Sequence, residues 1–209
     1  MPLFYQHNIN ENTKLGIWQI QEPESFFLRK VPLKKDVSHP HKRLQHLAGR
    51  YLLPELFPDF PLEEIVIADT KKPFLENEKY HFSISHCGDY AAAIVSSRWR
   101  VGIDIELVTP KISRISHKFL SPFEHEVVGS FSNLDELITA QTILWSAKES
   151  IFKWYSLGEV DFREHMQLQS QITSIEDHHE LPFVFKKNKP VDLIVHTKTF
   201  SSLVLTWVV

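Results

Sequence analysis

The sequence is poor in cysteine and glycine and has no long hydrophobic run, and each shortage excludes a class of protein. Cys87 is the single cysteine among 209 residues, which excludes an internal disulfide and a zinc site built on several cysteines. The six glycines form no glycine-rich phosphate loop. A membrane-spanning helix needs about 20 apolar residues in a row, and Met1–Tyr5 lacks the basic and apolar regions of a signal peptide. We therefore expect a cytoplasmic protein with no membrane partner.

The chain does contain enough apolar residues for a packed core, and its charge is unevenly spread. Hydrophobic residues make up 43% of the 209 positions, which predicts one large domain or two small ones. The net charge is only −3, yet between positions 29 and 50 the one acid, Asp36, is accompanied by Arg29, Lys30, Lys34, Lys35, Lys42, Arg43 and Arg50. This basic arm suits a nucleotide with several phosphates better than nucleic acid, so we expect no nucleic-acid partner. An ordinary solvated face is the alternative.

The stretch Val101–Leu107 alternates apolar and polar residues, which predicts a strand with one buried face. Its other face carries Gly102, Asp104 and Glu106, and two carboxylates about 7 Å apart along a strand repel each other. A hard cation between them would turn that repulsion into binding, and the glycine would leave room for a ligand. The alternative is a solvated edge of an antiparallel sheet.

Upstream, a helix is predicted from Ser38-His39-Pro40 to a stop at Pro54. Beside its apolar face, Arg43, His46 and Arg50 form a cationic stripe at i, i+3 and i+7. Such a stripe fits a phosphate-facing helix, but many exposed helices also show it.

Three strands, Tyr80–His86, Tyr90–Ser96 and Val101–Leu107, follow with short connections and predict an antiparallel meander. The meander would bring Ser85 and His86 close to the carboxylates of the third strand.

The second half carries a long predicted helix, capped at Asn133 and stopped near Gly158. Lys148 falls inside its apolar face, and lysine is almost never buried without a partner. It must either extend its amine to solvent or meet an anion. Glu149 and Lys153 flank that face, and the alternative for them is a surface pair at i, i+4.

Taken together, Asp104, Glu106 and Glu149 form a set of oxygen ligands typical of Mg²⁺, with Mn²⁺ as a possible substitute. Mg²⁺ usually binds one or two carboxylates together with substrate phosphates. The carboxylates, the lysines and the basic stripe therefore predict a site for a diphosphate ester and its metal.

Three motifs stand out in the sequence: Phe82–His86 (FSISH), Gly102–Glu106 (GIDIE) and Trp145–Lys153 (WSAKESIFK). They resemble the signature motifs of 4′-phosphopantetheinyl transferases, and His46–Arg50 and Lys72-Pro73 are similar to two weaker motifs of that family. The chain length resembles that of the larger, monomeric, surfactin-synthase-type class. The resemblance implies an α+β fold of two similar halves, 1–108 and 109–209, each an antiparallel sheet packed with a long helix, and a cleft between them that binds coenzyme A.

The resemblance further implies that the enzyme moves the phosphopantetheine arm to a serine of an acyl or peptidyl carrier protein and releases 3′,5′-ADP. Asp104, Glu106 and Glu149 would hold the metal, and Glu149 would also act as the base. The coenzyme A contacts that it implies are Arg43, Arg50, Lys72, Pro73, Ser85, His86, Asp104, Lys148 and Lys153, with Lys153 also stabilising the leaving group. Lys71 departs from the family pattern, which has glycine before Lys-Pro.

Two other functions fit parts of the sequence. A metal-dependent hydrolase of coenzyme A or of a nucleotide diphosphate would use the same carboxylates without a carrier protein. A binding module without enzymatic activity would use the basic arm to hold an acidic partner.

Overall fold

The computed structural model describes residues 3–32, 37–172, 175 and 177–209. It is a mixed α+β protein with antiparallel sheets, and it divides into two compact units, Met1–Ile105 (unit 1) and Glu106–Val209 (unit 2). The sequence placed the division after residue 108. The similarity of the two halves remains a prediction. Within the described ranges, no helix is both long and apolar enough to cross a membrane.

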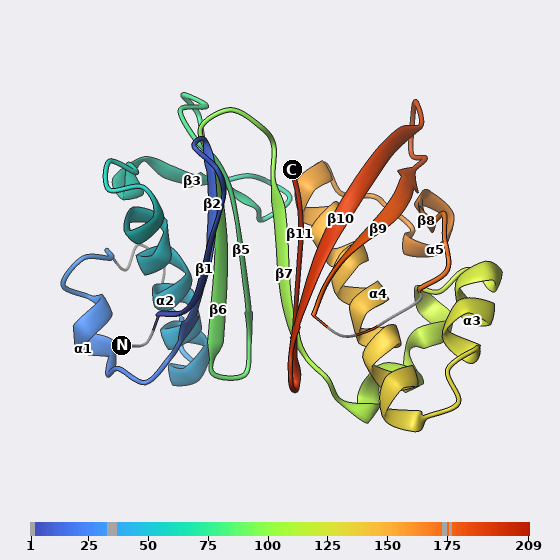
Figure 1. Ribbon diagram of the computed structural model, residues 1–209. Helices are drawn as coiled ribbons and strands as arrows, with labels where there is room; N and C mark the ends of the chain where they lie inside the picture. Colours follow the sequence, from blue (N-terminus) through green and yellow to red (C-terminus); the bar gives the residue numbers. More distant parts are fainter. Residues whose placement is uncertain (1–2, 33–36, 173–174, 176) are drawn as a thin grey trace. The chain divides into compact units, whose positions relative to one another are not determined.

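Unit 1 is built on an antiparallel sheet covered on one face by a helix (Figure 1). In the described residues the sheet has the order β1-β2-β6-β5, and α2 packs on β2, β5 and β6. The elements of this unit are β1 (Leu3–Asn10), β2 (Thr13–Gln19), α1 (Glu24–Phe27), α2 (Pro40–Leu56), η1 (Leu62–Glu64), β3 (Ile65–Ile67), β4 (Pro73–Leu75), β5 (His81–Cys87) and β6 (Tyr90–Ser96).

The predicted meander is wrong at its third strand. β5 and β6 pair antiparallel as expected, from His81↔Ser96 to Cys87↔Tyr90. The other edge of β6 pairs with β2, however, from Thr13↔Ser96 to Gln19↔Tyr90. A strand has only two edges for backbone hydrogen bonds, so β7 (Gly102–Leu107) cannot join β6, and it enters a second sheet beside β11 (Leu203–Val208).

Helix α2 starts where the sequence predicted but does not stop at Pro54. It continues to Leu56, because the buried Leu56 extends the buried face past the proline and the proline falls in the last turn. Gly49 lies where α2 crosses β5. A Cβ at this position would be 2.5 Å from Cγ2 of Ile84, so glycine permits the close approach of the helix to the sheet.

Unit 2 contains the strands β8 to β11 of the second sheet, whose order over the described residues is β7-β11-β10-β9-β8, with the long helix α4 packed on β10 and β11 (Figure 1). The sequence Ser121-Pro122-Phe123-Glu124 has the pattern that predicts a capping box, and Ser121 and Glu124 form that capping box at the start of α3. Helix α4 starts after Asn133 as predicted but ends at Tyr155, because Ser156 takes a left-handed conformation with φ 72° before Gly158 is reached. The remaining elements are η2 (Pro110–Arg114), η3 (Ser116–Lys118), α3 (Pro122–Gly129), α4 (Leu134–Tyr155), α5 (Phe162–His165), β8 (Met166–Leu168), β9 (His178–Phe185) and β10 (Val191–Phe200).

Candidate functional site

A cavity of about 620 Å³ lies in unit 1 between α2, the turn from β3 to β4, and β5. Its walls combine cationic side chains with a small apolar patch, and among the described residues that line it none is acidic. The polar wall includes Lys42, His46, Arg50, Lys71 and His86, and the apolar patch includes Ile67, Pro73 and Ile84. The size is typical of small-molecule sites. The composition suits an anionic ligand with a flat apolar portion, such as a nucleotide.

His46 and Arg50 act as a pair on this wall. They lie one turn apart on α2, with 3.0 Å between Nη1 of Arg50 and Nδ1 of His46. A guanidinium only donates, so Nδ1 of His46 accepts and the remaining ring proton lies on Nε2. Burial lowers the pKa of Arg50, but an arginine stays charged at neutral pH. The pair therefore contributes the positive charge of Arg50 to the cavity wall.

Arg43, which was predicted to contact coenzyme A, does not line the cavity. Its Nη2 and Nε donate to Oε2 of Glu24 at 2.7 and 2.9 Å, which joins α2 to α1. Lys42 lines the cavity in its place. Positions 42, 46 and 50 share one helix face, whereas position 43 is turned by about 100° from position 42. The i, i+4, i+8 spacing is the sequence signal that identifies Lys42, and the prediction chose the neighbouring stripe.

The turn between β3 and β4 contributes Pro73 and Lys71 to the cavity wall, but not Lys72. It is closed by two backbone bonds, from Lys71 N to Ala68 O at 2.8 Å and from Ala68 N to Lys72 O at 2.9 Å. Lys71 adopts φ 65°, in the left-handed region that glycine enters without steric cost. The glycine expected at this position from the family pattern thus has a backbone reason.

Ser85 and His86 point to opposite faces of β5, as neighbours on a strand do. His86 lines the cavity. Ser85 is buried, and its Oγ donates to Oδ1 of Asp104 at 2.7 Å. Ser83, on the same face, accepts a bond of 3.3 Å from the backbone N of Ile103. The predicted proximity of this strand to Asp104 is therefore confirmed, although by side-chain bonds and not by a meander, and Ser85 orients a carboxylate while His86 faces the cavity.

A tryptophan of α4 holds Glu106, one of the predicted site residues in unit 2. Nε1 of Trp145 donates to Oε1 of Glu106 at 3.1 Å. Trp145 precedes Glu149 by four residues on α4, so the two side chains share one face of the helix, and Lys153 follows on the same face one turn later. The indole thus ties the Glu106 carboxylate of β7 to the α4 face that carries Glu149.

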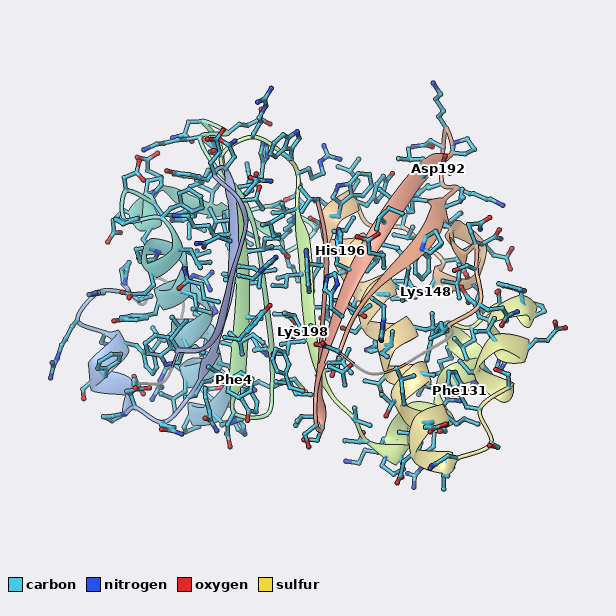
Figure 2. All side chains as sticks on the ribbon, viewed as in Figure 1. Phe4, Phe131, Lys148, Asp192, His196 and Lys198 are labelled. Carbon is cyan, nitrogen blue, oxygen red and sulfur yellow. The ribbon has the colours of Figure 1, made fainter. Side chains whose placement is uncertain are left out.

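Lys148 differs most from its prediction. It is fully buried in unit 2 (Figure 2). Its Nζ donates to Oε2 of Glu124 at 2.6 Å and to the backbone oxygens of Phe119 and Phe162 at 2.7 and 3.0 Å. An ammonium group has three N–H donors, and these three bonds use them all. The anion that Lys148 meets is therefore Glu124, and in this conformation no donor is left for a diphosphate.

Glu124 is as buried as its partner and has further bonds of its own. Its Oε2 accepts from the Ser121 backbone N at 2.7 Å and its Oε1 from the Leu168 backbone N at 3.1 Å. Burial lowers the pKa of Lys148, and the charge of Glu124 opposes that shift. The pair joins α3, α4 and β8. The sequence identified Glu124 only as a helix cap, because its pairing with a residue 24 positions later leaves no local signal.

The donor chemistry of the predicted metal ligands fits Mg²⁺, although the described part of the chain contains no cluster of three His, Cys, Asp or Glu side chains placed to hold a metal ion. Asp104 is only 3% exposed, and its carboxylate accepts a hydrogen bond from Ser85. Asp104 and Glu106 are each oriented by a neutral donor, as ligating carboxylates usually are. Mg²⁺ needs only one or two carboxylates when substrate phosphates complete its shell.

Comparison with known proteins adds an independent observation. Residues 100–208 match the family model described as ACPS, the 4′-phosphopantetheinyl transferase superfamily. The chain is 28% identical over 153 residues to the 4′-phosphopantetheinyl transferase AcpT of Escherichia coli (strain K12), covering 69% of this chain and 77% of AcpT. It is 34% identical over 115 residues to enterobactin synthase component D of the same strain, covering 54% of each chain.

Proposed function

Because the chain belongs to the 4′-phosphopantetheinyl transferase superfamily, whose enzymes use coenzyme A for phosphopantetheine transfer, we propose that it transfers the 4′-phosphopantetheine arm of coenzyme A to a serine of an acyl or peptidyl carrier protein. The other product is 3′,5′-ADP. We propose further that it belongs to the larger, surfactin-synthase-type class and acts as a monomer, in line with its length of 209 residues.

The observation that carries the proposal is the cationic cavity of unit 1. Lys42, Arg50 and His86 supply the charge and hydrogen bonds that a nucleotide phosphate needs, and the side chains of Ile67 and Pro73 offer an apolar surface for a base. The adenosine 3′-phosphate end of coenzyme A has both properties. The cavity would anchor this end of the substrate, so that the diphosphate is positioned for transfer.

In the transfer step the carrier serine Oγ bonds to the phosphorus that bears the pantetheine arm. The bond from that phosphorus to the bridging oxygen breaks, and 3′,5′-ADP leaves with the electron pair. A serine hydroxyl is a weak nucleophile, so its proton must be taken by a base, a role proposed for Glu149. Lys153, one turn beyond, would stabilise the negative charge that develops on the leaving group.

Asp104, Glu106 and Glu149 are the residues proposed to hold Mg²⁺, which, when bound, would neutralise the diphosphate. Ser85 and Trp145 would orient two of these carboxylates, because they donate hydrogen bonds of 2.7 Å to Asp104 and 3.1 Å to Glu106. Lys148 is proposed to position the neighbouring Glu149 and not to contact the diphosphate.

The direct test incubates the purified protein with coenzyme A, Mg²⁺ and apo carrier proteins, and follows carrier mass. A gain of one phosphopantetheine group, with one equivalent of 3′,5′-ADP, is the expected result, and Glu149→Gln should abolish it. Release of phosphopantetheine at the same rate without a carrier would instead identify a hydrolase. Coenzyme A binding without either product would identify a binding module. A panel of acyl and peptidyl carrier proteins would then identify the carrier.

A further inference from the structure

Lys71 has a backbone conformation that lysine rarely adopts. Its φ is 65°, and its backbone N–H is bonded to Ala68 O at 2.8 Å in the turn between β3 and β4. Antiparallel pairing of Ile67 with Pro73 fixes both ends of this turn. The turn therefore imposes a left-handed residue at position 71, and glycine would satisfy it without steric conflict. A lysine at this position has a conformational cost, and its backbone makes no bond in the turn that glycine could not make.

What lysine adds is its side chain, because Lys71 lines the cavity opposite α2. Lys71 joins Lys42 and Arg50 there, and no acidic residue is among the described lining residues. Adding a third cation to such a wall raises the repulsion between like charges in the empty site. The addition is favourable only when an anion of high charge occupies the cavity.

We propose that Lys71 is a specificity-determining residue, whose ammonium group recognises the dianionic 3′-phosphate monoester of the nucleotide in this cavity. This inference rests on the proposed use of coenzyme A. A phosphate monoester carries close to two negative charges at neutral pH, by analogy with phosphorylated side chains, whereas each phosphate of a diphosphate diester carries one. Three cations lining one cavity match the charge of the monoester. Lys71 thus makes the site more selective for 3′-phosphorylated nucleotides than the same turn with glycine would be.

The test measures binding of 3′,5′-ADP and of 5′-AMP by isothermal titration calorimetry, so that no turnover is needed. Lys71→Met removes the charge and keeps the chain length, Lys71→Arg keeps the charge, and Lys71→Gly removes both the charge and the steric conflict. Lys189→Met, at an exposed position in unit 2, is the matched control. Lys71→Met should weaken 3′,5′-ADP about tenfold, the scale of one charged hydrogen bond, and leave 5′-AMP within about twofold.

Lys71→Gly should lose the same affinity as Lys71→Met, while Lys71→Arg and Lys189→Met should retain the affinity of the wild type. The loss should also shrink as salt concentration rises, because an exposed ion pair is screened. Equal weakening of both nucleotides in Lys71→Met, or no weakening of either, would overturn the role of Lys71 while leaving the coenzyme A site intact. A wild-type protein that binds neither nucleotide would overturn the proposed site together with this inference.

Discussion

Replacing Lys148 by methionine distinguishes a structural lysine from one that binds the substrate. Methionine is an unbranched side chain of similar length that can fill the same space. The substitution leaves Glu124 buried with its two backbone donors and without a countercharge, and it removes the donor to the Phe119 and Phe162 oxygens. Removing one partner of a buried ion pair costs about 3–5 kcal/mol, so we expect the free energy of unfolding to fall by that amount.

With an m-value of roughly 2 kcal/mol/M in urea, this loss lowers the unfolding midpoint by about 2 M. Because two units can unfold separately, the unfolding of unit 2 should be followed by hydrogen exchange of α4 (Leu134–Tyr155) as urea is raised. The exposed Lys118→Met in the same unit is the control and should not move the midpoint. Adding Glu124→Gln to Lys148→Met should restore at least ~1 kcal/mol, since no buried charge then remains unpaired.

The opposite pattern would refute the structural role of Lys148. If Lys148→Met kept the wild-type midpoint and weakened coenzyme A binding, its amine would be a ligand contact, as the sequence motif predicts. The expected result is a large loss of stability with 3′,5′-ADP affinity at the wild-type level when measured well below the unfolding midpoint, because the cavity belongs to unit 1.

Three further predictions follow from other contacts. Gly49→Ala places a Cβ 2.5 Å from Cγ2 of Ile84 and so forces α2 away from β5. The thermal midpoint should fall by an amount that corresponds to about 1–3 kcal/mol of lost stability. An unchanged midpoint would contradict this prediction. The pKa of Asp59 is held at about 2, first by its hydrogen bond from Lys79 and second by that from Tyr80. The folded pKa of Asp59 lies below the unfolded value of about 3.9, so the stability that the Asp59 carboxylate contributes is present above about pH 3.9 and is lost as the pH falls through about 2. Tyr80→Phe should raise the Asp59 pKa in a carboxyl NMR titration. An unchanged pKa would refute the role of the phenol. Trp145→Phe removes the hydrogen bond from the indole to the carboxylate of Glu106. The substitution should therefore raise the Mg²⁺ concentration needed for half-maximal transfer and leave the affinity for coenzyme A unchanged.

Local signals predicted local structure well. The capping box of Ser121 and Glu124 and the Asn133 cap are set by residues within three positions of each other, and both are present in the structure. The strand from Gly102 to Leu107 follows from its alternation alone. Helix α2 exceeded its predicted end because burial of Leu56 outweighs the one hydrogen bond that a proline in the last turn removes.

The sequence by itself identified the residue types that are proposed to perform phosphopantetheine transfer: the carboxylates, the lysines and the basic helix, each recognisable from motif and period. Only the tertiary structure decided how these residues are used. It paired Arg43 with Glu24, placed Lys42 and Lys71 on the cavity wall, bonded Ser85 to Asp104 and buried Lys148 against Glu124. The physical reason is that the partner of a charged side chain depends on distances between elements far apart in the chain. Spacing along the sequence does not determine those distances.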